Sequence, residues 1–116
     1  MTYDAIVIGA GAAALFFGAL NKDKLNILML ERNDRVGKKI LTTGNGRCNY
    51  TNTKLNENPY NDKAFTSYII EKYGYEAILE KFKAMGVYPY MEDDRVYPMS
   101  LQASSVLDVL LSLIHI

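Results

Sequence analysis

Apolar residues near the start of the chain form two short runs on either side of a helix-like segment. The run Tyr3–Gly9 is rich in β-branched residues and ends at glycine. This pattern predicts a strand buried on both faces, as in a parallel sheet. Residues Ala12–Leu20 suit a helix, and a second apolar run, Leu25–Glu31, stops at a charge. Strand, helix and strand in this order predict a right-handed βαβ unit.

The next segment, Arg32–Asp62, has no sustained periodicity and is rich in Asn, Thr, Gly and charged residues. Such a composition disfavours both helix and strand and predicts a long loop. Loops of this length are uncommon inside compact domains and are usually functional or mobile. The segment is therefore a candidate for part of a binding site.

Two apolar stripes at helical spacing follow the loop. The first stripe consists of Phe65, Tyr68, Ile69 and Tyr73, and the second of Ile78, Leu79, Phe82 and Met85. We expect two helices that are separated by Gly74, with Gly86 ending the second. We expect both stripes to belong to the core rather than to a cofactor site.

Short strands and one more helix complete the pattern. The segments VYPYM and RVYPM, residues 87–91 and 95–99, predict two strands around an acidic turn, with prolines that suit sheet edges. Ser104 or Ser105 is expected to cap a last helix that continues through Leu110. The predicted fold class is α/β, a Rossmann-like βαβ unit followed by helices and short strands.

Composition narrows the class of protein. A chain of 116 residues with 49% apolar and 22% charged residues suits one globular domain. The single cysteine excludes a disulfide scaffold, and the net charge of zero does not favour nucleic acid or anionic membrane as a partner. The uncharged run Ala5–Leu20 lacks the basic segment of an export signal and is too short to span a membrane. We therefore expect a cytoplasmic protein with no membrane partner and no metal.

The first candidate for chemistry is GAGAAA, Gly9–Ala14, which fits the dinucleotide-binding pattern G-x-G-x-x-G/A between a predicted strand and a predicted helix. Gly9 would allow the tight turn, and Gly11 would let a pyrophosphate approach the backbone. Ala14 would allow close packing of helix on strand. The N–H groups at the start of the helix favour phosphate. The alternative is a Gly-rich turn in an ordinary α/β protein.

The acidic residue that this motif requires is present. Glu31 ends the second predicted strand, about 20 residues after the turn. A carboxylate at this place can accept hydrogen bonds from the ribose of adenosine, and it repels the 2′-phosphate of NADP. The position of Glu31 therefore favours a dinucleotide without that phosphate.

The polar stretch KKILTTGNGRCNYTN, Lys38–Asn52, leaves the second strand beside this expected site. Backbone N–H groups at glycines and cationic side chains can both meet phosphate. The glycines are Gly44 and Gly46, and the cations are Lys38, Lys39 and Arg47. Asn49 can donate and accept hydrogen bonds at a polar ring edge. FAD suits this arrangement better than NAD, because it must be wrapped and kept; a plain connecting loop is the alternative.

Three segments together resemble a known family. They are YDAIVIGAGAAAL, LERNDRVGKKILTTGNGRCNYTN and DDRVYPMSLQASSVLDVL. They are similar to bacterial NAD(P)/FAD-dependent oxidoreductases of the aminoacetone oxidase-like or bile-acid-inducible flavoprotein-like kind. The Gly-Arg-Cys-Asn segment is the most specific part, and Arg95–Ser104 is independent support. The resemblance runs from about Tyr3 to about Leu110. It implies that residues 1–110 are the truncated, N-terminal part of an FAD-binding Rossmann-like domain in a longer chain with an inserted domain.

The resemblance implies cofactor-binding roles in the pyrophosphate turn, at the ribose acid and in the signature loop. The candidate residues are Gly9, Gly11, Ala12, Ala13, Ala14, Glu31, Arg32, Lys39, Gly44, Gly46, Arg47, Cys48 and Asn49. Asn45 stands where the family usually has glycine, and we expect the loop shape to survive because Asn tolerates left-handed backbone. A relay of two thiols needs a second cysteine, so we expect Cys48 to be a packed residue near the flavin rather than a redox thiol.

The function implied by the resemblance is a flavoprotein oxidoreductase, in which FAD accepts hydride from NAD(P)H or an organic substrate and passes electrons on. No residue is identified as catalytic, and no pattern indicates the small-molecule substrate or the oligomeric state. Two alternatives stay open. One is a nucleotide-binding module without turnover, and the other is a flavin-dependent RNA-modifying enzyme, which the absence of a basic excess disfavours.

The end of the chain breaks the pattern. Residues 111–116, LSLIHI, form an apolar stretch without periodicity. One choice of codons for this stretch matches the start of an adapter used in sequencing libraries, so we interpret it as a non-native tail and expect no role for His115. The chain itself is then expected to be an inactive fragment that is poorly soluble or holds FAD weakly, because open strand edges favour aggregation.

Overall fold

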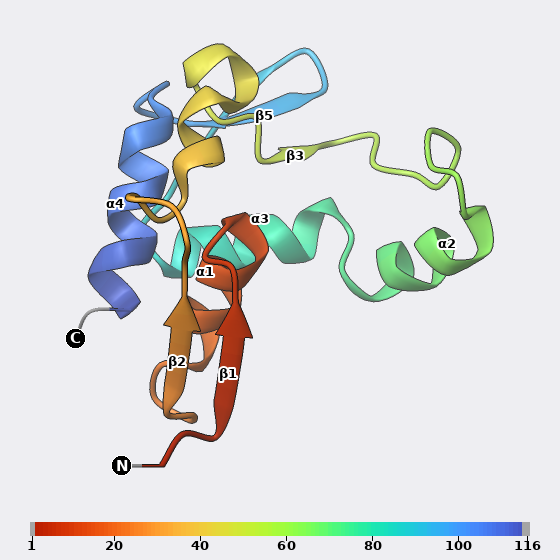
Figure 1. Cartoon of the computed structure of the whole chain (residues 1–116). Helices are drawn as coiled ribbons and strands as arrows, with labels where there is room; N and C mark the ends of the chain where they lie inside the picture. The colour runs from red at the N-terminus through yellow and green to blue at the C-terminus, as the bar shows by residue number, and fades with distance from the viewer. Residues whose placement is uncertain (1, 115–116) are drawn as a thin grey trace.

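The computed structural model describes residues 2–114 and confirms the βαβ unit at the start of the chain (Figure 1). Strand β1 (Ala5–Ile8) leads into helix α1 (Ala12–Asn21), which leads into strand β2 (Ile27–Leu30). The two strands are parallel, and their register pairs Ala5 with Ile27 and Ile8 with Leu30. Both strands therefore end at the same edge of the sheet, where the turn into α1 begins.

The expectation that the first strand is buried on both faces is wrong. Ile6 is 61% exposed and Ile8 is 80% exposed, while the alternate residues Ala5 and Val7 are half-buried. In the part of the chain that the structure describes, β1 pairs only with β2, and α1 and α4 (Ala103–Ile114) are in contact with each other. One face of the strand pair consequently stays open to solvent.

The segment predicted as one long loop contains two short elements. A 3₁₀ segment, η1, covers Lys38–Gly46, and a short strand, β3, covers Thr51–Asn52. The helical backbone of η1 breaks at Thr43, Gly44 and Asn45, of which the last two have positive φ. The polar composition hides both elements, since neither is long enough to show a periodicity.

A second sheet confirms the predicted pair of short strands. Strands β4 (Pro89–Glu92) and β5 (Arg95–Pro98) form an antiparallel hairpin around the acidic turn, and β3 pairs with the other side of β5. The strand order is β3-β5-β4, so Pro89 lies on an edge strand and Pro98 ends the central one. Proline has no N–H to donate to a neighbouring strand, and it is tolerated on an edge strand or at the end of a strand.

Helices occupy the two predicted regions after the loop, and a third closes the chain. Helix α2 covers Lys63–Lys72, α3 covers Tyr75–Ala84, and α4 runs to Ile114. Gly74 precedes α3 and Gly86, with φ of +95°, follows it, as predicted. The predicted serine cap is wrong: α4 already begins at Ala103, and the Ser105 hydroxyl donates to the carbonyl oxygen of Gln102.

The core lies between α1, α4 and η1 (Figure 1). Its central buried residues are Leu15, Ile40, Phe82, Val106, Leu107 and Leu110. The apolar stripe of α3 reaches this core through Phe82, and Ile78 and Met85 pack against it. The stripe of α2 does not, because α2 has no buried residue and lies at the periphery of the molecule. The prediction of a second core stripe is therefore wrong.

The residues interpreted as a non-native tail are partly described. Leu111, Leu113 and Ile114 continue α4 and pack against the buried core. His115 lies outside the described residues. Within residues 2–114, no helix combines the length and apolar character needed to cross a bilayer.

Candidate functional site

The turn between β1 and α1 has the geometry that the glycine motif predicts. Gly9 has φ of +90°, a conformation that residues with a β-carbon rarely adopt. Its N–H donates to the carbonyl oxygen of Leu30 at 2.7 Å, which closes the end of the parallel strand pair. The chain then turns through the buried Ala10 into α1. Gly9 is thus required by the turn itself.

Gly11 is glycine for a different reason. Its φ of −88° and ψ of −168° are open to any residue, and a β-carbon at this position would have no atom beyond the adjacent residues within 4 Å. Gly11, Ala12 and Ala13 are all exposed, and no side chain caps the start of α1. The first N–H groups of the helix therefore face open space, which is the arrangement that binds phosphate.

Glu31 lies directly behind this turn. One oxygen of its carboxylate, Oε1, accepts from the N–H of Ala10 at 2.9 Å, and Oε2 accepts from the N–H of Asn33 at 2.9 Å. These hydrogen bonds, from Asn33 first and Ala10 second, lower the pKa of Glu31 below its usual range. A negative charge is therefore fixed at the end of β2, next to the turn, while the neighbouring Arg32 is exposed.

The loop after β2 returns to the same turn. The N–H of Gly37 donates to the carbonyl oxygen of Ala10 at 2.8 Å. Gly37 has φ of +63°, and a β-carbon there would lie 2.4 Å from a methyl carbon of Leu107. Lys38 and Lys39 follow as the first residues of η1, and both are exposed. The sequence pattern did not single out Gly37, although a glycine just before two lysines was the available signal.

The signature loop folds back on itself at Gly44. This residue has φ of +55°, and a β-carbon on it would lie 2.4 Å from the backbone nitrogen of Asn49. Asn45 has φ of 56°, so the expectation that asparagine supports the loop's left-handed backbone is confirmed. Gly46, with φ of +84°, has open space where its β-carbon would be. Gly44 therefore allows the backbone at Asn49 to approach closely.

Arg47 is held by the β4–β5 hairpin. Its guanidinium forms an ion pair with Glu92 at 3.3 Å and donates to the Tyr97 hydroxyl at 3.2 Å. The guanidinium carbon also lies 4.3 Å from the centre of the Tyr97 ring. The sequence pattern did not reveal Glu92 or Tyr97 as partners. Among the described contacts, none joins Arg47 to the turn at Gly9–Ala14, and a phosphate contact by Arg47 stays a prediction.

Cys48 and Asn49 tie the loop to the core and to β5. Cys48 is 6% exposed, and burial raises the pKa of its thiol. A neutral, packed thiol is the expected form, because the thiolate is the reactive species. The side-chain oxygen of Asn49 accepts from the N–H of Val96 at 3.3 Å. Packing of Cys48 is what the sequence predicted, whereas its proximity to a flavin stays a prediction.

Comparison with known families places this geometry in context. The family of the HI0933-like protein Rossmann domain matches residues 3–115. The chain belongs to this family. The match confirms the resemblance drawn from the three sequence segments and the Rossmann-like fold class.

Three relatives match this chain over different lengths. A 3-dehydro-bile acid delta(4,6)-reductase of Clostridium scindens is 37% identical over 109 residues, which is 90% of this chain and 27% of the relative. Ribosomal RNA dihydrouridine synthases of Escherichia coli and Haemophilus influenzae are 42% and 40% identical over 50% and 47% of this chain, or 15% and 16% of their own lengths. The chain therefore spans about a quarter or less of these relatives.

The fold brings together only part of the predicted site. The turn at Gly9–Ala14, Glu31 and the start of η1 are linked by hydrogen bonds through Ala10. Arg47, Cys48 and Asn49 form a second group, which is attached to β5 and the hairpin rather than to the turn. The sequence pattern predicted one site. In the structure, one group of its residues belongs to the β1–α1 turn and the other is attached to β5 and the hairpin.

Proposed function

We propose that this chain binds the ADP portion of FAD as the N-terminal part of a flavin-dependent oxidoreductase. The observation that carries the proposal is the open turn at Gly11, where the start of α1 is uncapped and the position of a β-carbon is empty. A helix start with free N–H groups and a positive dipole end favours a pyrophosphate. The family supports the proposal, since the Clostridium scindens relative is named a reductase.

Backbone N–H groups and the Glu31 carboxylate would contact different parts of the nucleotide. The N–H of Ala10 is already used by Glu31, so the N–H groups of Gly11, Ala12 and Ala13 are the ones that face a ligand. Glu31 is charged at neutral pH, and its carboxylate can accept hydrogen bonds from ribose hydroxyls without leaving the turn. The same charge disfavours a 2′-phosphate, so NADP is not the ligand proposed for this turn.

FAD would supply the hydride or electron transfer when bound, with NAD(P)H or an organic compound as the donor. The role of this chain is to hold and orient the nucleotide end. Lys38 and Lys39 are exposed at the start of η1. They directly follow Gly37, whose N–H donates to the carbonyl oxygen of Ala10 in the turn. Their place supports a screening role for pyrophosphate charge. No catalytic residue is proposed within the chain.

A second candidate is a flavin-dependent enzyme that modifies RNA. Two relatives are named ribosomal RNA dihydrouridine synthases, and their identity over the matched half of the chain is 42% and 40%. The net charge of zero does not favour RNA contact by this part of the protein. RNA binding by the longer parent that weakens steeply with salt would favour this candidate over a small-molecule substrate.

Replacement of Glu31 tests the ribose role. We expect Glu31→Gln to weaken FAD binding about tenfold, because the amide loses the charge and one of two acceptor oxygens. The measurement is an equilibrium dialysis titration with FAD on the purified chain. Glu80→Gln is the matched control, since Glu80 is an exposed acid on α3. Equal FAD affinity in the two variants would contradict the ribose role of Glu31.

A further inference from the structure

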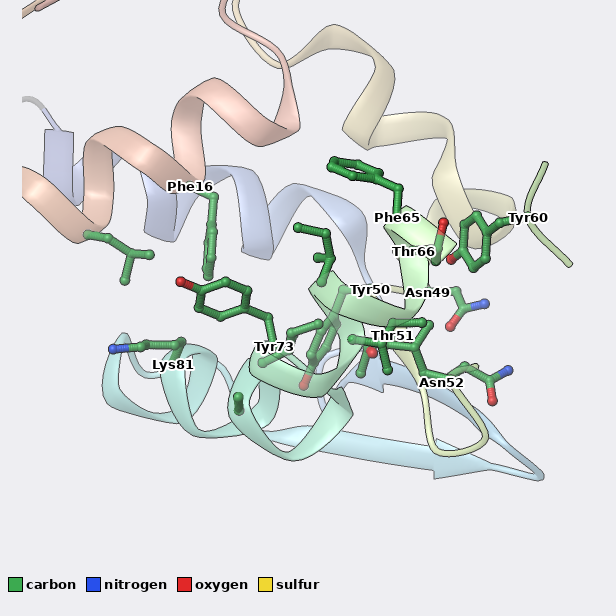
Figure 2. A pocket seen from close by; sticks show the side chains of 16 residues that line it. Phe16, Asn49, Tyr50, Thr51, Asn52, Tyr60, Phe65, Thr66, Tyr73 and Lys81 are labelled. Carbon is green, nitrogen blue, oxygen red and sulfur yellow. The ribbon is translucent and has the colours of Figure 1, made fainter. Parts of the chain in front are cut away.

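A groove lies apart from the nucleotide turn, and none of the residues Gly9–Ala14 lines it. Its volume is about 830 Å³, within the range of cavities that take small molecules. The walls come from α1, from the segment around β3, and from α2 and α3 (Figure 2). The groove therefore joins the signature loop, at Asn49, to the two helices that follow it.

Aromatic side chains dominate the walls. They are Phe16, Tyr50, Tyr60, Phe65 and Tyr73. Phe65 is 64% exposed and Tyr73 is 60% exposed, although both belong to the apolar stripe of α2. Figure 2 shows Phe65 and Tyr73 extending from the α2 segment, and Phe16 extending from α1. The α2 stripe, which fails to reach the core, thus forms a wall of the groove, and flat rings suit such walls.

The polar groups of the groove are few and have one sign of charge. Lys81 lies at one end and Asn49 and Asn52 lie toward the other (Figure 2). No aspartate or glutamate is among the lining residues, so Lys81 is the one charged group there in the described part of the chain. Lys81 is exposed at this end of the groove, and a cation at the mouth of a groove favours an anion over a cation, by the modest amount expected of an exposed ion pair.

Two lining residues carry buried hydroxyl groups. The Tyr50 hydroxyl and the Thr51 hydroxyl are buried and make no hydrogen bond among the described residues. Burial raises the pKa of Tyr50 to about 12, so its hydroxyl keeps its proton. Because neither hydroxyl oxygen is accessible to solvent, a ligand in the groove would contact the walls around these two groups rather than the hydroxyls themselves.

We propose that this groove binds a flat, apolar carboxylate whose rings pack between α1 and α2 and whose negative end lies at Lys81. The aromatic walls select the ring system, and the lone cation selects the charge. The inference does not rest on the proposed FAD site, because the groove and the nucleotide turn share no residue. A ligand here would lie beside the signature loop, which supplies Asn49 to the groove.

Three compounds with one ring system test the charge preference. They are anthracene-9-carboxylate, 9-anthracenemethanol and 9-(aminomethyl)anthracene, titrated against the chain by fluorescence at pH 7.5 without FAD. We expect the carboxylate to bind about threefold or more tighter than the alcohol, as for a partly exposed ion pair, and the amine to bind most weakly. Failure of all three to bind, or equal affinity for the acid and the alcohol, would overturn the proposal.

Variants of one lysine show whether the preference comes from this groove. Lys81→Met should remove the difference between acid and alcohol, and Lys81→Glu should favour the amine over the acid. Lys83→Met is the control, since Lys83 is exposed on the same helix but does not line the groove. Circular dichroism confirms that each variant is folded; if one is not, the three compounds on the unaltered chain decide alone. An unchanged acid preference in folded Lys81→Met, or a dimer in sedimentation that the acid does not dissociate, would also overturn the proposal.

Discussion

Gly11→Val is expected to weaken FAD binding about a hundredfold or more while leaving the fold intact. The valine side chain would project into the open space at the uncapped start of α1, where a pyrophosphate must approach the backbone. The backbone angles of Gly11 suit valine, and no atom beyond the adjacent residues lies within 4 Å of the new β-carbon. The measurements are an FAD titration and a thermal melt of the same samples.

Gly11→Ala provides a graded control for this substitution. A single methyl group fills less of the space, so its effect on FAD affinity should lie between those of glycine and valine. Both variants should melt within a few degrees of the unaltered chain. Unchanged FAD affinity in folded Gly11→Val would show that the nucleotide does not lie at this turn.

Gly44→Ala is expected to destabilise the fold by about 3 kcal/mol, through left-handed backbone strain and a close contact together. The new β-carbon would lie 2.4 Å from the backbone nitrogen of Asn49, which a side-chain movement cannot relieve. Urea denaturation of the purified chain measures the change in the free energy of unfolding.

Gly46→Ala separates the two causes. Gly46 also has positive φ, but open space surrounds the place of its β-carbon. Its replacement should cost only the strain of the left-handed backbone, about 1 kcal/mol. Equal losses of stability in the two variants would contradict the assignment of Gly44 to the close approach of Asn49.

The βαβ unit could be predicted because its signals are local. The apolar runs and the Gly-rich turn between them fix strand, helix and strand within one continuous segment. The elements η1 and β3 could not, since a 3₁₀ segment and a two-residue strand carry no periodicity. Strand β3 exists only because Thr51 pairs with Val96, which is far along the chain. Long-range pairing of this kind has no signature in the segment itself.

The candidate site shows the same division. Glu31 was placed correctly beside the turn, because parallel strands end at one edge of a sheet. The partners of Arg47 were not predicted, since a hairpin 45 residues later brings Glu92 to it. The stripe of α2 has the spacing of a core helix, yet its side chains line a groove. Spacing identifies an apolar face and does not identify what covers that face.

An NMR titration of the chain with ADP tests the central claim, that the β1–α1 turn holds the nucleotide end of FAD. Amide shifts are measured for the isotope-labelled chain at increasing ADP concentration, and adenosine without phosphate serves as the control ligand. The account predicts that the largest shifts fall on the N–H groups of Gly11, Ala12 and Ala13, which face open space at the start of α1. Largest shifts elsewhere, with these three amides unmoved at saturation, would contradict it.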